Sequence, residues 1–230
     1  MGRVLILGGS GRTASAADAL TRVGIEVQVY WSRAASTDHL SCAAHLRQGL
    51  CWANGMVDTT HVFDAELRTV AHTIAPDLPT VRYARPLWKA EPRYNWKLAR
   101  SLGEAVGLLP KGARVFAATG RESAEILGHH DGPVFLRQLQ RHDDPAPGQL
   151  QYVFGAGPFA EKEEAALFQE LEIDVLLARN VGGAASYPKI AAARHLGLPV
   201  VMVQPDLSDA TDTANDETAL LAWAQAFVCG

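Results

Sequence analysis

The chain has 230 residues, of which 48% are hydrophobic and 20% charged, and its formal net charge is -4 at pH 7. This length is enough to bury a substantial core, in one large or two small domains. The negative charge gives no electrostatic reason to expect nucleic acid or an anionic membrane as a partner, and no apolar run approaches the length that spans a bilayer.

The first predicted strand, residues 4–7, is a short apolar run without alternation, as is typical of a parallel strand covered on both faces. A glycine turn of the form G-x-G-x-x-A follows directly and leads into an alanine-rich helix. This context favours a dinucleotide-binding unit, whose phosphates meet free N–H groups at the positive end of the helix. The alternative is a bare strand-to-helix turn. The predicted cofactor contacts here are Gly9, Ser10, Gly11, Arg12 and Thr13.

The second predicted strand, residues 25–30, bears on the choice of nicotinamide cofactor. NAD sites place an acidic residue at the tip of this strand, whereas NADP sites place a cation there. Here the strand runs through Trp31 into Ser32 and Arg33, with no acid at its tip. Ser32 and Arg33, together with Arg12, therefore favour the 2′-phosphate of NADPH over NADH. The alternative for Arg33 is an exposed cation in a loop.

A helix is predicted over residues 36–54, and a third strand over residues 56–59 leads into Thr60 and His61. Because ligands bind beyond the carboxyl ends of strands in an open parallel sheet, Thr59 and Thr60 are predicted cofactor contacts. His61 is predicted either to contact a cofactor phosphate or a substrate carboxylate, or to cap the next helix.

A helix near residues 65–74 and a strand at 80–84 complete the first alternating set. The segment 85–100 then carries five cations and one acid among Trp88, Tyr94 and Trp96, which suits a large, flat polyanion. Two alternatives remain. Such a segment could also bind single-stranded nucleic acid, but the negative net charge of the chain argues against this. The other alternative is a solvated crossover between domains.

From Lys111 onward the alternation of strands and helices restarts and continues to residue 228. The sequence therefore predicts an α/β protein with two Rossmann-like, doubly wound parallel-sheet lobes and a cleft between them. Residues 1–100 are expected to form the dinucleotide-binding lobe, and residues 101–230 the lobe that completes the substrate cleft. Three segments at the ends of predicted strands either add backbone N–H donors to a shared binding face or are plain turns. They are residues 119–121, 155–157 and 180–183.

The chain has three cysteines, Cys42, Cys51 and Cys229, an odd number without the spacing of a metal site. The N-terminus lacks the basic region and long apolar core of a signal peptide. We therefore expect reduced thiols, a cytoplasmic location and no bound metal.

Motifs spread over almost the whole chain resemble those of the precorrin-6A reductase family. They are Leu5-Ile6-Leu7-Gly8-Gly9-Ser10, Asp58-Thr59-Thr60-His61-Val62-Phe63, Arg85-Pro86-Leu87-Trp88, Thr119-Gly120-Arg121, Gly157-Pro158-Phe159, Asn180 with Gly182-Gly183, and Lys189 followed by the segment 192–201. The chain departs from the family pattern at Val62 and Asp64, where Pro and Ala are usual, and at Arg179 and Val181, where Lys and Ser are usual. It also lacks the glycine-rich segment expected between the second and third strands.

The resemblance implies hydride transfer from NADPH to a double bond of precorrin-6A beside ring D, giving precorrin-6B, while the adjoining carbon gains a proton. The proton donor is Asp58, His61 or water. The implied substrate is a flat tetrapyrrole with acetate and propionate carboxylates, and transient contact with neighbouring pathway enzymes is a further expectation. The implied substrate contacts are Arg85, Trp88, Lys89, Thr119, Gly120, Arg121, Arg179, Asn180, Gly182, Gly183 and Lys189.

Two other functions compete with this one. A short-chain dehydrogenase would carry a Tyr-x-x-x-Lys pair, and no tyrosine of this chain is followed by lysine at that interval. A non-catalytic NADPH-sensing module would bind the cofactor but not a tetrapyrrole. The fold alone does not separate these classes.

Overall fold

The computed structural model describes residues 2–31, 39–91, 94–206 and 212–228. The chain divides into two compact units, of which the first comprises Met1–Pro86 with Asp206–Gly230 and the second Leu87–Pro205. Each unit is built around its own parallel sheet. The predicted α/β class with two Rossmann-like parallel sheets is therefore confirmed.

The first unit contains a five-stranded sheet in the order β11-β4-β3-β1-β2, in which every described pairing is parallel. Its strands are β1 (Arg3–Gly8), β2 (Glu26–Trp31), β3 (Gly55–Asp58), β4 (Thr80–Tyr83) and β11 (Asp212–Ala214). Its helices are α1 (Arg12–Arg22), α2 (His39–Trp52), α3 (Glu66–Ile74) and α8 (Glu217–Phe227).

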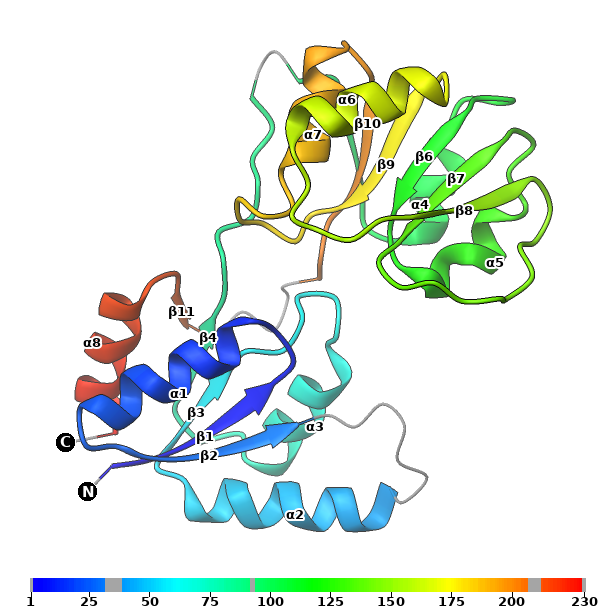
Figure 1. Ribbon diagram of the computed structural model, residues 1–230. Helices are drawn as coiled ribbons and strands as arrows, with labels where there is room; N and C mark the ends of the chain where they lie inside the picture. The colour runs from blue at the N-terminus through cyan, green and yellow to red at the C-terminus, as the bar shows by residue number, and fades with distance from the viewer. Residues whose placement is uncertain (1, 32–38, 92–93, 207–211, 229–230) are drawn as a thin grey trace. The chain divides into compact units, whose positions relative to one another are not determined.

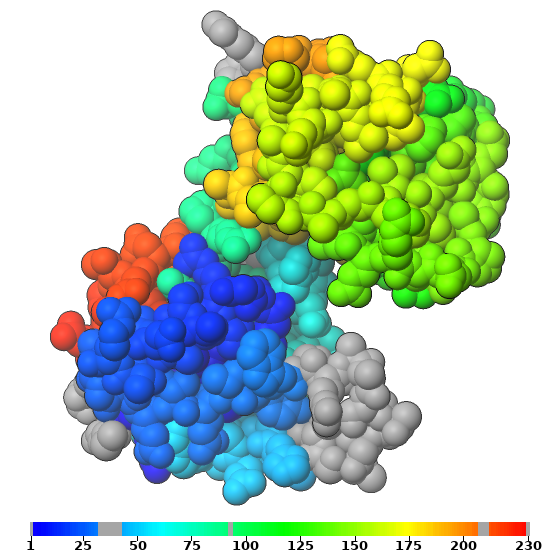
Figure 2. Space-filling model, in the orientation of Figure 1, coloured from blue at the N-terminus to red at the C-terminus, as the bar shows by residue number. Residues whose placement is uncertain are grey.

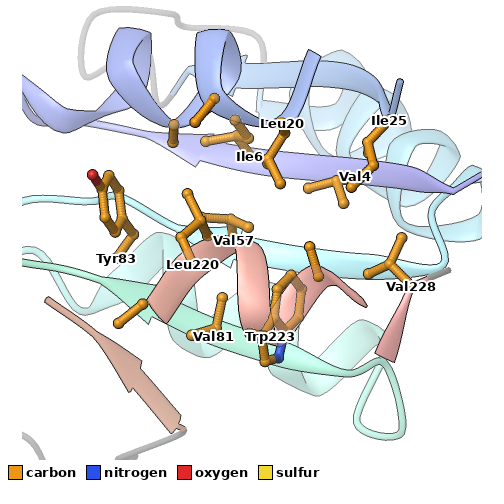
Figure 3. Close-up of a cluster of buried hydrophobic side chains, with 14 residues drawn as sticks. Val4, Ile6, Leu20, Ile25, Val57, Val81, Tyr83, Leu220, Trp223 and Val228 are labelled. Carbon is orange, nitrogen blue, oxygen red and sulfur yellow. The ribbon is translucent and has the colours of Figure 1, made fainter. Parts of the chain in front are cut away.

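Strand β1, which lies between β3 and β2, is buried because helices cover both faces of the sheet (Figure 1). Val4 and Ile6 point to one face, where they pack with Leu20 of α1 and with Leu220 and Trp223 of α8 (Figure 3). On the other face, the alternate residues of β1 pack against α2 and α3. Two covered faces explain why the strand reads as a continuous apolar run rather than as an alternating one.

The second unit contains a six-stranded sheet in the order β5-β10-β9-β6-β7-β8, again with parallel pairings. Its strands are β5 (Trp96–Ala99), β6 (Val115–Ala118), β7 (Val134–Gln138), β8 (Leu150–Phe154), β9 (Val175–Arg179) and β10 (Val200–Val203). Its helices are α4 (Leu102–Gly107), the short 3-10 turn η1 (Arg121–Ser123), α5 (Ala124–Leu127), α6 (Glu161–Glu170) and α7 (Pro188–His195). Phe116, Phe168, Leu176 and Ile190 form the core beneath α6 and α7.

The boundaries of the two units differ from the domain boundary expected between residues 100 and 101. Residues 87–100 fall in the second unit because β5 pairs with β10, and Asp206–Gly230 falls in the first because β11 pairs with β4. The last helix, α8, packs on α1 within the first unit, and Figure 2 shows this red segment against the blue N-terminal one. Each unit is thus completed by a strand from the other half of the sequence.

No helix in the described part of the chain is long and apolar enough to cross a membrane.

Candidate functional site

Each sheet has one position at which the strand order reverses direction. In the first unit this switch lies between β1 and β3, and in the second it lies between β6 and β9. Ligands of open α/β sheets bind beyond the carboxyl ends of the strands at such a switch. The loops that leave these four strands contain most of the residues that the sequence analysis selected.

The glycine turn occupies the first switch point. It joins the end of β1 at Gly8 to the start of α1 at Arg12, and Gly11 is the N-cap residue, without a capping side chain. Within the turn, the N–H of Arg12 donates to Ser10 Oγ at 3.3 Å. The first turn of α1 carries no acidic residue, so the positive end of the helix dipole faces no carboxylate of that turn.

Buried threonines tie the glycine turn to the loop that follows β3. Thr13 Oγ1 lies 2.8 Å from Thr59 Oγ1, and Thr59 donates its hydroxyl proton to the carbonyl of Leu7 at 2.7 Å. Thr13 and Thr59 are 2% and 1% exposed. The structure therefore brings these two predicted cofactor contacts together, but their hydroxyl groups bind one another and the backbone. They hold the two loops in place.

Gly9 is required because the two loops approach each other closely at this point. A Cβ added there would lie 3.0 Å from Thr60 Cα and 3.2 Å from the His61 nitrogen. Both of these are backbone atoms, which a rotation of a side chain cannot move. The first glycine of the G-x-G-x-x-A turn is thus required by the neighbouring loop.

Gly9→Ala is expected to lower the free energy of unfolding by about 1–3 kcal/mol, because the added methyl group overpacks this contact. Dinucleotide affinity should fall with it, since the turn shifts. Denaturant unfolding and a dinucleotide titration measure the two effects. The matched control is Gly107→Ala, where nothing lies within 4 Å of the added Cβ. Equal stability and equal dinucleotide affinity in both variants would contradict the prediction.

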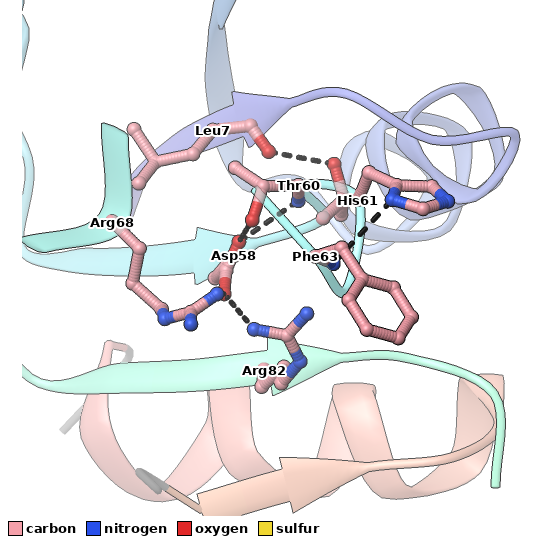
Figure 4. Close-up of polar contacts among 8 residues, drawn as sticks. Leu7, Asp58, Thr60, His61, Phe63, Arg68 and Arg82 are labelled. Carbon is pink, nitrogen blue, oxygen red and sulfur yellow. Dashed lines mark hydrogen bonds and ion pairs between the residues drawn. The ribbon is translucent and has the colours of Figure 1, made fainter. Parts of the chain in front are cut away.

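Asp58 sits at the end of β3 in a fully enclosed polar cluster (Figure 4). Its Oδ2 accepts a hydrogen bond from Arg82 Nη1 at 2.7 Å and lies 3.6 Å from Arg68 Nη1. Its Oδ1 accepts from the N–H of Thr60 at 2.8 Å and from the Thr60 hydroxyl at 2.6 Å. Burial lowers the pKa of the Arg82 guanidinium, an effect that Asp58 opposes and Arg68 reinforces.

This enclosure argues against Asp58 as a proton donor. Its carboxylate is 1% exposed and is the shared counter-ion of two buried guanidiniums. A carboxylate in that setting has no open face toward a ligand. Asp58 instead fixes the conformation of the Thr60 turn.

His61 lies exposed in the same loop. The N–H of Phe63 donates to His61 Nδ1 at 3.4 Å, which closes a local turn. The N-cap residue of α3 is Ala65, which makes no side-chain capping hydrogen bond. Both predicted roles of His61, as a helix cap and as a contact with a cofactor or a substrate, stay predictions.

Two arginines flank the glycine turn. The Arg12 guanidinium lies over the ring of Tyr83, 4.5 Å from its centroid. Arg85 Nη2 lies 3.9 Å from the position that a Gly11 Cβ would occupy. Arg85, expected among the substrate clamps, is thus beside the predicted phosphate site of the first unit. The predicted 2′-phosphate contacts Ser32 and Arg33 lie outside the described residues.

The second switch point carries Thr119, Gly120 and Arg121 after β6. Thr119 is buried, and its hydroxyl lies 2.7 Å from Ser123 Oγ, which donates to the carbonyl of Gly120. Gly120 has a φ of 92°, a conformation that residues with a side chain rarely adopt. These contacts fix the start of the short 3-10 turn.

Two of the predicted clamps have acidic partners within the second unit. Arg121 pairs with Asp144, and Arg179 pairs with Glu122. Asp144 and Glu122 are both well exposed. Both side chains of the Arg121–Asp144 pair are exposed, and such pairs contribute little to stability, so a carboxylate of a ligand can displace Asp144 at small cost.

Asn180 fixes Trp88, although the two residues are far apart in the sequence. The N–H of Trp88 donates to Asn180 Oδ1 at 2.9 Å, and Asn180 Nδ2 donates to the carbonyl of Trp88 at 2.8 Å. The indole N–H of Trp88 donates to the carbonyl of Gly183 at 2.9 Å. Gly182 and Gly183 have positive φ values of 66° and 74°. The loop after β9 thus sets the position of a large aromatic ring.

Lys189 lies beside that ring, in the first turn of α7. Its Nζ is 5.8 Å from the centroid of the Trp88 ring and donates to the carbonyl of Ser186 at 2.6 Å. Burial lowers the pKa of Lys189 from 10.5 to about 8. Lys89 is exposed on the segment between β4 and β5.

Arg68 and Arg82, which are 3% and 6% exposed, are not among the residues selected from the sequence. A signal for Arg82 was present in the sequence, because an arginine stands between Val81 and Tyr83 in an otherwise apolar strand. A buried arginine needs a counter-ion, and Asp58 ends the neighbouring strand.

Comparisons with known proteins agree with one another. The model of the precorrin-6x reductase CbiJ/CobK family matches residues 3–225. The chain is 34% identical over 241 residues to a precorrin-6A reductase of Rhodococcus erythropolis, covering 97% of each chain. It is 38% identical over 157 residues to one from Sinorhizobium sp, covering 65% of this chain and 59% of that relative. The solved structure of a CobK precorrin-6A reductase matches with a TM-score of 0.82 and 25% identity, over 99% of this chain and 97% of that one.

Proposed function

The chain belongs to the precorrin-6x reductase CbiJ/CobK family, and on that basis we propose that it transfers a hydride from NADPH to one double bond of precorrin-6A. The product is precorrin-6B, and the reaction is a step of cobalamin biosynthesis. The chain is accordingly an oxidoreductase. The observation that carries the proposal is that the family motifs gather at the two switch points, one in each sheet.

The first switch point suits the phosphates of a dinucleotide. The glycine turn exposes backbone at the positive end of α1, and Arg12 and Arg85 add two positive charges beside it. We assign the cofactor contacts to the turn from Gly9 to Thr13, to Arg12 and Arg85, and to the loop of Thr59 and Thr60. Ser32 and Arg33 stay the predicted contacts of the 2′-phosphate. The bound cofactor would supply the hydride.

The second switch point suits a flat polycarboxylate. Trp88 is held by three hydrogen bonds, two through its backbone and one from its indole N–H, which makes the ring a rigid stacking surface. We assign carboxylate binding to Arg121, Arg179, Lys89 and Lys189, with Gly120, Gly182 and Gly183 supplying backbone contacts. Their task is to orient the macrocycle, because its conjugated system can itself accept the electrons of the hydride.

The deciding experiment mixes the purified protein with NADPH and precorrin-6A and follows the nicotinamide absorbance and the visible spectrum of the macrocycle together. We expect stoichiometric oxidation of NADPH with a changed macrocycle spectrum, and slower turnover with NADH. Arg33→Ala should narrow the difference in turnover rate between NADPH and NADH, because it weakens NADPH more than NADH. Tight NADPH binding without turnover would overturn the proposal in favour of a sensing module. If Arg33→Ala weakened the binding of NADPH and NADH equally, only the assignment of Arg33 to the 2′-phosphate would be overturned.

The cytoplasmic location and the transient contacts with neighbouring pathway enzymes stay predictions. Both concern the cell rather than the isolated chain, and neither affects the reaction assay.

A further inference from the structure

Reduction of a carbon–carbon double bond needs a proton as well as a hydride. The hydride forms one new C–H bond, and the adjoining carbon must receive a proton. Asp58, one of the donors considered from the sequence, is enclosed between two guanidiniums. The donor must be a group that faces a ligand and releases a proton near neutral pH.

We propose that Lys189 is the proton donor, because its ammonium group lies at the face of the fixed Trp88 ring, within the cluster assigned to the macrocycle. This inference rests on the proposed function, since it names a further role for a residue of the same site. It assigns to Lys189 a catalytic task beyond the binding of a carboxylate.

The position of Lys189 is set by the structure around it. Lys189 is the second residue of α7, directly after Pro188, and its Nζ donates to the carbonyl of Ser186 at 2.6 Å. An ammonium has three N–H groups, so two remain after this hydrogen bond. The Trp88 ring lies 5.8 Å from Nζ, and its indole N–H is fixed by the carbonyl of Gly183 while Asn180 holds the backbone of Trp88. A group stacked on Trp88 would therefore lie beside Nζ.

The charged groups that act on Lys189 are Glu164 of α6 and Arg137 of β7. They bind each other at 2.9 Å and are both largely buried. Glu164 raises the pKa of Lys189 and Arg137 lowers it, so their effects oppose one another and burial dominates. The resulting pKa of about 8 is low enough for a lysine to act as a general acid near neutral pH. The arginines of the site cannot do so, because a guanidinium does not release its proton in this range.

The step balances as follows. The macrocycle gains a hydride at one carbon of the double bond, and the electron pair of that bond forms a C–H bond at the adjoining carbon with a proton from Nζ. The N–H bond of the ammonium breaks and leaves a neutral amine. The amine then takes a proton from water. Overall, NADPH is oxidised by two electrons and the macrocycle is reduced by two.

The test compares Lys189→Arg and Lys189→Met with the parent protein over pH 6–10. Arginine keeps the positive charge for carboxylate binding but cannot donate the proton. We expect Lys189→Arg to bind precorrin-6A within about threefold of the parent, whereas kcat falls by about 100- to 10,000-fold. In the parent, kcat should fall about tenfold per pH unit above the pKa of Lys189, because only the ammonium form can donate. Lys162→Arg, an exposed change on α6, is the matched control.

Three results would overturn the inference. One is a kcat of Lys189→Arg that stays within a few-fold of the parent, and another is an unchanged pH profile in that variant. Both would leave Lys189 as a carboxylate clamp while the proposed function stands. The third is a parent protein that binds NADPH and precorrin-6A but shows no turnover at any pH, which would remove the proposed function and this inference together. Binding of precorrin-6A by Lys189→Arg shows at the same time that the variant is folded.

Discussion

Replacing Asp58 with Ala is expected to lower the free energy of unfolding by about 3–5 kcal/mol. The substitution leaves the Arg82 and Arg68 guanidiniums without the carboxylate that lies 2.7 Å and 3.6 Å from them. Both arginines are almost fully buried, so water cannot replace the lost counter-ion. The Thr60 turn also loses two hydrogen bonds, and dinucleotide affinity should decrease with it.

Urea unfolding, together with hydrogen exchange of the amides in β3 and β4, measures this effect within the first unit. The matched control is Glu217→Gln, which breaks the 2.7 Å ion pair with Arg22 between two well-exposed side chains. That pair should contribute at most about 1 kcal/mol. If Asp58→Ala and Glu217→Gln shifted the unfolding midpoint equally, the cluster around Asp58 would not be the stabilising feature described above.

Replacing Asn180 with Ala is expected to raise the dissociation constant of precorrin-6A more than about tenfold while leaving NADPH affinity unchanged. Asn180 is 0% exposed, and its amide satisfies both the N–H and the carbonyl of Trp88. Without these hydrogen bonds, the backbone of Trp88 loses its anchor and the ring is held only by the indole N–H that donates to the carbonyl of Gly183. Stability should fall as well, by about 1–3 kcal/mol for each buried group left without a partner.

Separate titrations with NADPH and with precorrin-6A distinguish this effect from general unfolding. The control is Asn54→Ala, because exposed Asn54 accepts a single hydrogen bond, from the N–H of Arg3 at 3.1 Å. It should change neither titration. A parallel loss of both affinities in Asn180→Ala would mean that the residue supports the whole protein rather than the position of Trp88.

The fold class and the position of the selected motifs at strand ends were accessible from the sequence because their signals are local. An apolar run that is buried on both faces, followed by the glycine turn, predicts a strand, a phosphate-binding turn and a helix within a few residues. The motifs around Thr119 and Asn180 likewise stand directly after apolar runs. Since parallel strands present their carboxyl ends at one edge of a sheet, such motifs can be expected to gather there.

The domain boundaries were not accessible in the same way. The strands β5 and β11 have only four and three residues, and each pairs with a strand that is distant in the sequence. Such short segments carry almost no periodicity. Their position depends on which sheet edge offers them hydrogen bonds, and this is known only once the sheets exist.

The roles of individual charged residues were also decided by the tertiary structure. Asp58 was one of three proton donors considered, beside His61 and water, and only the structure shows that it is enclosed by Arg68 and Arg82. Arg85 was considered as a substrate contact, and only the structure shows that it lies beside Gly11. By itself, the sequence determined the alternation of the main strands and helices and which family the motifs resemble, because both depend on neighbouring residues. Only the tertiary structure decided which charges are paired and which edge strand completes each sheet, because these are contacts between residues far apart in the chain.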